Sequence, residues 1–134
     1  MIGIDSSVLL RYLLDDDPVW SPVATRFIEE ELTVETPGYI DLVVLAETVW
    51  SLRRSPLFEK SKLASVVEGL LEFDKFVIAD RDVVADALSR FRADGAGFAD
   101  FLIAELNRAA GASVTVAIDR AAARSLVFKR LPER

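Results

Sequence analysis

The chain opens with MIGIDSSVLLRYLL, residues 1–14, and this stretch decides the fold. Ile2 to Ile4 is expected to form a short strand, because it is apolar and ends at a turn. Asp5-Ser6-Ser7 then forms a strand-to-helix turn whose serines can cap a helix over Val8 to Leu14. The stretch therefore predicts a strand followed by a helix, with an acid at the carboxyl end of the strand.

Helices and short strands alternate along the rest of the chain. Apolar side chains recur at helical spacing in five more segments, Pro18 to Leu32, Ile40 to Arg54, Glu59 to Phe73, Asp82 to Arg92 and Phe98 to Ala110. Strands are expected at Thr33 to Thr36, Phe76 to Ile78 and Val114 to Ile118. The alternation predicts an α/β fold, a three-layer α/β/α arrangement around a short, mainly parallel central sheet.

Length and composition narrow the possibilities further. The 134 residues contain no repeat and no linker rich in Gly, Pro or Ser, so a single domain over residues 1–134 is expected. The absence of cysteine excludes disulfides and zinc-thiolate sites, and it suits a cytoplasmic protein. The absence of histidine excludes a Ser-His-Asp triad and histidine metal ligands. Acid-base chemistry must therefore use carboxylates or metal-bound water.

Four acids stand in otherwise apolar segments: Asp5, Glu47, Asp100 and Asp119. Their surroundings suggest burial, and carboxylates are rarely buried unless a cation or another partner gathers them. Asp5 and Asp119 follow strands, where α/β sheets bind ligands, although each could also be a plain helix N-cap. Glu47 is predicted mid-helix in an apolar setting, with no cap or strand-end role. The set predicts a metal site.

Charge and hydropathy leave the partner open. The net charge of −6, from 16 basic and 22 acidic residues, argues mildly against strong nonspecific binding to nucleic acid. Without the four acids the 16 basic residues face 18 acidic ones, and two divalent cations would offset the four charges. No leader sequence is expected, nor any apolar run near the roughly 18 residues of a membrane span, so no membrane partner is expected.

Four fragments carry a resemblance to a known family. MIGIDSSVLLRYLLDDDP, VVLAETVWSLRR, FADFLIAELNRAAGA and VTVAID resemble, in order and spacing, the acid-bearing segments of the PIN-domain nucleases. The likeness is greatest to the VapC-type toxins of toxin-antitoxin systems. Ser7 stands where many members have Asn, and Ala117-Ile118 replaces a Thr/Ser-Phe pair, so one orienting hydroxyl is missing.

The resemblance implies an endoribonuclease that uses Mg²⁺, for which Mn²⁺ substitutes, to hydrolyse RNA with metal-activated water. It makes Asp5 and Asp100 the principal metal ligands and Asp119 a ligand, directly or through water. It assigns Glu47, within the same metal site, to the attacking water and Ser6 to holding a carboxylate in place. The family also implies a cognate antitoxin and a homodimer.

The sequence alone leaves several interpretations open. Arg11, Arg53 and Arg54 are candidates for phosphate contact, or else solvated helix ends. Trp20 and Trp50 lie in apolar helical stripes and are expected in the core or an interface. The missing hydroxyl at Ala117 leaves open a catalytically quiet PIN-like module that only binds RNA or protein. A haloacid dehalogenase-type phosphatase would need a second Asp at position 7, which is Ser.

Overall fold

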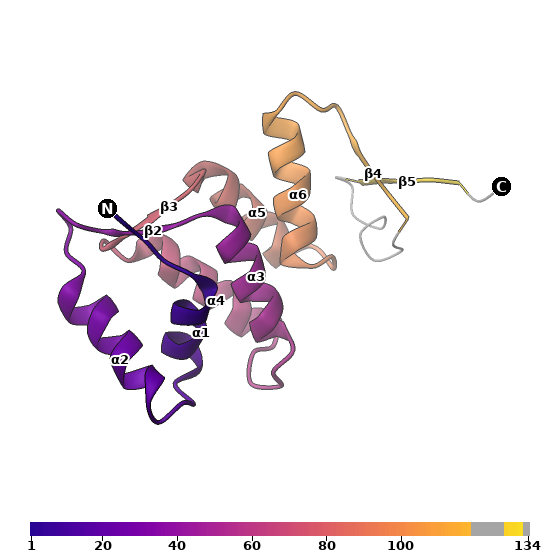
Figure 1. Cartoon of the computed structure of the whole chain (residues 1–134). Coiled ribbons are helices and arrows are strands. Elements are labelled where there is room, and N and C mark those ends of the chain that lie inside the picture. The colour runs from indigo at the N-terminus through magenta and orange to yellow at the C-terminus, as the bar shows by residue number, and fades with distance from the viewer. Residues whose placement is uncertain (119–127, 133–134) are drawn as a thin grey trace. The chain divides into compact units, whose positions relative to one another are not determined.

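The computed structural model describes residues 1–118 and 128–132, and these fall into two compact units, Met1–Ala79 and Asp80–Arg134 (Figure 1). Helices alternate with short parallel strands along the chain. This alternation confirms the predicted α/β class and is consistent with a three-layer α/β/α fold.

The first unit is built on a sheet of three parallel strands, β1 (Ile2–Gly3), β2 (Gly38–Ile40) and β3 (Phe76–Ile78), in that order. Gly38 of β2 lies opposite Ile2 on one side and Phe76 on the other. Only glycine fits at this position, since a Cβ there would come within 2.9 Å of Ile4 Cγ1. All three strands end at one edge of the sheet, which places Asp5, directly after Ile4, at that edge.

Four helical segments accompany this sheet. They are α1 (Ser6–Leu14), α2 (Trp20–Arg26), which continues as the π-helical turn η1 (Phe27–Glu31), α3 (Leu42–Arg53) and α4 (Lys60–Glu72). Helix α1 packs against α2 and α3, and α4 packs against α3 and β3. The core of the unit is aliphatic, with no exposed surface on Leu9, Ile28, Leu32, Ile40, Leu52 and Val67. Burial of this apolar surface holds α1 and α3 in place.

A buried hydroxyl ties the start of α2 to α1. Ser21 is 1% exposed, and its hydroxyl donates to the Arg11 carbonyl at 2.7 Å and accepts from the Asp17 N–H at 3.2 Å. Asp17 in turn accepts from the N–H groups of Trp20 and Val19, and these bonds lower the pKa of its carboxyl. The last acid of the run after α1 therefore satisfies backbone N–H groups in the turn that leads into α2.

The second unit contains the helix pair α5 (Arg81–Ala93) and α6 (Phe98–Ala109). Phe91 and Phe98 meet edge to face between them, with ring centroids 6.0 Å apart. Gly111 has a φ of 101° just after α6, the left-handed conformation expected where a helix stops. Strand β4 (Thr115–Ala117) follows and pairs in parallel with β5 (Phe128–Arg130).

One expected strand is wrong. Thr33 to Thr36 forms a tight turn, because the Thr33 hydroxyl accepts from the Thr36 N–H at 2.9 Å and the Thr33 N–H donates to the Thr36 carbonyl. The strand of this region is β2 instead: Gly38 and Tyr39 had no predicted element, and Ile40 was predicted to begin a helix. A short threonine-rich segment can bond to its own backbone, and this local bonding outweighs its β-propensity. Among the residues that the structure describes, no helix is both long and apolar enough for a bilayer.

Candidate active site

Asp5 is the N-cap of α1, at the carboxyl end of β1. Its Oδ2 atom accepts from the Ser7 hydroxyl at 2.6 Å and from the Ser7 N–H at 3.2 Å. These two bonds, the hydroxyl first, hold the pKa of the exposed Asp5 carboxyl below its usual value. The carboxylate is therefore ionised at neutral pH and fixed in orientation. The N-cap role that the sequence left open for Asp5 is real, and it leaves the second oxygen free to bind a cation.

Glu47 reaches the same turn from another helix. The Ser6 hydroxyl donates to Glu47 Oε1 at 2.7 Å, a contact between residues 41 positions apart. Ser6 is 5% exposed and lies at the first position of α1, so its hydroxyl has a fixed direction. Two adjacent serines thus each orient one carboxylate at the carboxyl edge of the sheet.

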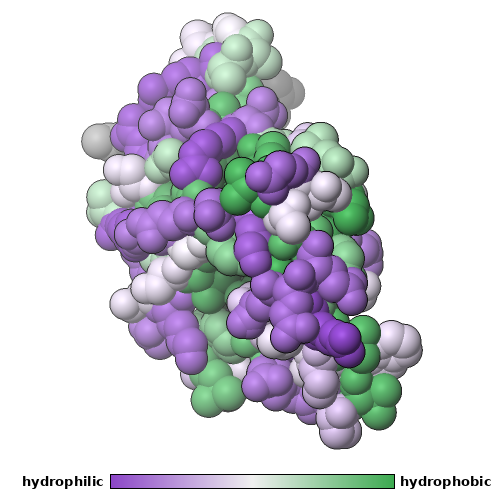
Figure 2. Space-filling view, turned by 90° about the vertical axis from the view of Figure 1, so that its left-hand side faces the viewer, coloured by the Kyte–Doolittle hydropathy of each residue, from purple (hydrophilic) through white to green (hydrophobic). Residues whose placement is uncertain are grey.

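The expectation that these acids are buried is wrong. Asp5 and Glu47 are exposed, and Asp100 is half-buried. The apolar neighbours of Glu47 misled the prediction, because Val43 and Trp50 on the same helix are 73% and 54% exposed. Figure 2 shows hydrophobic residues standing among hydrophilic ones on the face in view. The buried side chains of α3 lie on its other face and include Leu45, Val49 and Leu52.

Asp100 lies in the second unit, in the first turn of α6. Its Oδ2 atom accepts from the Gly97 N–H at 3.0 Å, which fixes the carboxylate at the positive end of the helix dipole. Asp119 follows β4 and falls outside the described residues. In neither unit do the described residues gather three acidic side chains around one point.

The residues expected to bind substrate are all exposed. Arg11 lies near Asp16 at 3.6 Å and Asp17 at 4.0 Å, so acids already share its charge. Arg53 ends α3, and the Arg54 guanidinium lies 4.8 Å from the centre of the Trp50 ring. Trp20 and Trp50 are 60% and 54% exposed, so the expectation of a core position is wrong for both.

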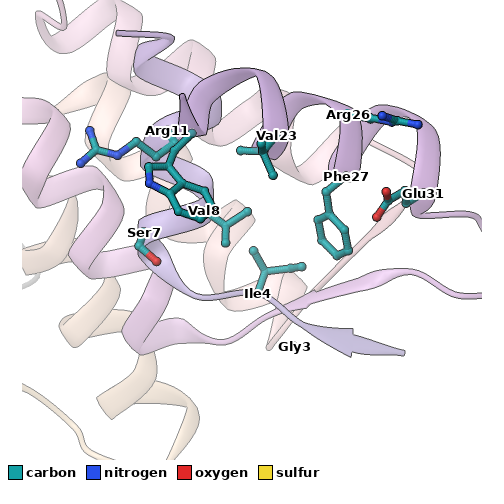
Figure 3. Close-up of a pocket in the computed structure, with 11 residues that line it drawn as sticks. Gly3, Ile4, Ser7, Val8, Arg11, Val23, Arg26, Phe27 and Glu31 are labelled. Carbon is teal, nitrogen blue, oxygen red and sulfur yellow. The ribbon is translucent and has the colours of Figure 1, made fainter. Parts of the chain in front are cut away.

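A cavity of about 740 Å³ lies beside Ser7, between β1, α1 and the α2–η1 segment (Figure 3). In Figure 3, Ile4, Val8, Val23 and Phe27 point into it, while Arg11 lies at one end with its guanidinium directed outward. The lining is mainly apolar, and the Asp5 and Glu47 carboxylates are not part of it. Hard cations such as Mg²⁺ take oxygen ligands, so the acids on the open edge of the sheet suit such a cation better than this mainly apolar cavity does.

Among the described residues, one acidic side chain is buried, and it is not one of the four candidate acids. Glu105 in α6 is 5% exposed, and its Oε1 atom lies 3.5 Å from Arg90 and 3.9 Å from Arg108. Two arginines offset the cost of burying this charge, which makes it a structural ion pair between α5 and α6. The i, i+3 spacing of Glu105 and Arg108 was the available signal.

Comparison with protein families decides the identity of the fold. The model of the PIN domain matches residues 2–124, which is most of the chain and includes all four candidate acids. The chain belongs to the PIN domain family. PIN domains are generally metal-dependent nucleases, so the chain is a nuclease-type module. No curated protein and no solved structure matches it.

The donors available at the sheet edge of this PIN domain are carboxylate oxygens, the ligand type that hard cations take. Asp5 and Glu47 offer ionisable carboxylate oxygens at a solvent-accessible edge, without sulfur or nitrogen ligands nearby that would favour zinc. Hydroxyl groups fix both carboxylates, as outer partners of metal ligands do. In the sequence, Ser7 was noted only as a possible cap and as a departure from the family's Asn, and the bonds from Ser7 to Asp5 were not predicted. A hydroxyl two residues after an N-cap aspartate was the signal that could have predicted them.

Proposed function

We propose that this PIN domain, as a single domain over residues 1–134, is a Mg²⁺-dependent endoribonuclease that acts as the toxin of a toxin-antitoxin system. The observation that carries the proposal is the pair of hydroxyl-held carboxylates, Ser7 on Asp5 and Ser6 on Glu47. They lie where open α/β sheets bind ligands, at the carboxyl end of a parallel strand. Because the chain has no histidine, its acid-base chemistry depends on such carboxylates or on metal-bound water.

Each acid has a distinct part in the proposed reaction. Asp5 and Asp100 would hold Mg²⁺, with Asp119 as a further ligand. Asp100 contributes the oxygen that Gly97 does not occupy. Glu47, oriented by Ser6, accepts the proton of the attacking water. When bound, Mg²⁺ supplies the positive charge that activates water and stabilises the leaving oxygen.

The proposed partners rest on the family. A cognate antitoxin and a second copy of the chain would each bind at a surface of this protein. Two exposed valines, Val19 just before α2 and Val23 on it, support a protein partner there. A cytoplasmic location suits an enzyme without cysteine that acts on cellular RNA.

A matched pair of capping aspartates tests the proposal. Asp5 and Asp41 are both exposed N-caps, Asp41 accepting from the Val44 N–H at 2.7 Å, but only Asp5 is a proposed ligand. Asparagine caps helices about as well as aspartate, so both Asn variants should fold. Purified protein with Mg²⁺ or Mn²⁺ should cleave structured RNA. Asp5→Asn should lower the cleavage rate about 100-fold or more, and Asp41→Asn should cleave like wild type.

A second pair isolates the helix acid. Glu47→Gln should lose cleavage to a similar extent, while Glu72→Gln, an exposed glutamate on α4, should retain it. If Asp5→Asn and Glu47→Gln cleave as well as their controls, the proposal fails. If wild type takes up no metal and cuts nothing yet binds RNA, the chain is the quiet module that Ala117 left open.

A further inference from the structure

Positive charge in the first unit is concentrated in one short segment. Residues 1–79 contain 14 acidic residues and seven basic ones, and four of the seven lie within ten positions: Arg53, Arg54, Lys60 and Lys62. All four are exposed, at the end of α3 and the start of α4. We call these residues the basic segment. Within a unit of net negative charge, the basic segment is the place where a polyanion is attracted.

An exposed tryptophan stands beside the basic segment. Trp50 is 54% exposed even though the Arg54 guanidinium lies 4.8 Å from its ring centre. The arginine steadies the ring from one side and leaves much of the ring surface open to solvent. A large aromatic surface held in water next to positive charge is the combination that binds the bases and phosphates of a single strand.

Helix geometry joins Trp50 to the candidate active site. Glu47, Trp50 and Arg54 are three and four residues apart, so they lie along one face of α3. At 1.5 Å per residue this row extends about 10 Å along the helix axis, with Glu47 at one end and the basic segment at the other. An RNA strand that runs along this face, from a scissile phosphate at Glu47 toward the basic segment, would therefore pass over Trp50.

We propose that Trp50, backed by Arg54, is a stacking platform for an unpaired base of single-stranded RNA, and that the basic segment contacts the adjoining phosphates. The inference rests on the proposed function and adds the path of the substrate strand. A single strand fits better than a duplex, because paired bases do not offer their faces for stacking. The negative charge of RNA complements the basic segment. The acidic remainder of the unit would repel RNA, so binding is directed to that segment.

Binding without cleavage tests the platform separately from catalysis. A fluorescein-labelled single-stranded oligoadenylate is titrated in EDTA, and its anisotropy gives the dissociation constant. Trp50→Leu should weaken binding about tenfold, and Trp50→Phe should restore most of the loss. Trp20→Leu is the matched control, since Trp20 is a similarly exposed tryptophan outside the platform, and this variant should bind like wild type.

Salt dependence tests the phosphate contacts. For a single strand, each lost contact should reduce the slope of log K against log salt by about 0.7. Arg53→Gln should show this reduction, whereas Arg26→Gln, an exposed arginine on α2 that pairs with Glu30, should not.

Three results would overturn the platform. They are wild-type affinity in Trp50→Leu, equal binding of single strand and duplex, and absence of RNA binding by the wild-type protein. Preferential binding of an acidic peptide would also overturn the proposal, because the occupant of this surface would then be a protein and not RNA. A protein that binds RNA through Trp50 but never cleaves it with Mg²⁺ or Mn²⁺ would end the proposed function and leave the platform standing.

Discussion

Replacing Ser6 by alanine removes the hydroxyl that orients Glu47, and its effect can be estimated from the structure. The bond is short, 2.7 Å, and its acceptor is a carboxylate, a class of bond with a net contribution of about 1.5–3 kcal/mol. Because Glu47 is exposed, water partly replaces the hydroxyl, so the lower end of that range applies. A loss of about 1.4 kcal/mol corresponds to a tenfold slower chemical step.

Stability should change much less than activity in this variant. Alanine is a good residue in the first turn of a helix, and the freed Glu47 carboxylate can be solvated. We expect the free energy of unfolding to change by less than about 1 kcal/mol, measured by urea titration. Ser65→Ala is the matched control, since the Ser65 hydroxyl donates to the Ser61 carbonyl within α4, away from Glu47 in sequence.

The assay is single-turnover cleavage of a labelled RNA with saturating Mg²⁺, which separates the chemical step from substrate binding. Ser6→Ala should lower the rate constant about tenfold with KM nearly unchanged. In a Glu47→Gln background, Ser6→Ala should have no further effect, because the serine acts through Glu47. Wild-type cleavage by Ser6→Ala, or additive losses in the double variant, would refute a positioning role for Ser6.

Three further outcomes are expected. Chelation with EDTA should abolish cleavage and added Mn²⁺ should restore it, measured on the same RNA. Because Ser7 lowers the pKa of Asp5, the Asp5 carboxylate stays ionised at pH values low enough to protonate an ordinary aspartate. Ser7→Ala should raise that pKa, so the lowest pH at which Mn²⁺ binds should move to higher pH. A limit that does not move would contradict the assigned cause. Leu9→Ala, at a fully buried position of α1, should cost about 3 kcal/mol in urea unfolding, and a loss below 1 kcal/mol would contradict the described core.

Much of the fold could be predicted from the sequence because its helices are long and periodic. The predicted ends of α3 and α6 differ from the observed ones by at most two residues. Strands of three residues carry little periodic signal, so β2 was missed and Thr33 to Thr36 was misassigned. Pairing between distant segments, such as Gly38 with Ile2, decides those strands, and no local pattern contains it.

The candidate site was only partly predictable. Asp5 and Glu47 were singled out by their apolar surroundings and were given roles by the family resemblance. The burial inferred from those surroundings was wrong, since apolar neighbours on α3 are exposed as well. Ser6 was expected to hold a carboxylate, yet which carboxylate depends on how α1 packs against α3. Contacts between residues 41 positions apart come from packing and not from local spacing.

Metal uptake tests the central claim, that Asp5 belongs to a cation site of this PIN domain, most directly. Calorimetric titration with Mn²⁺ should show binding to the wild-type protein and to Asp41→Asn, and a loss of at least tenfold in affinity for Asp5→Asn. No uptake by the wild type at millimolar Mn²⁺, or equal uptake by Asp5→Asn and Asp41→Asn, would contradict the account.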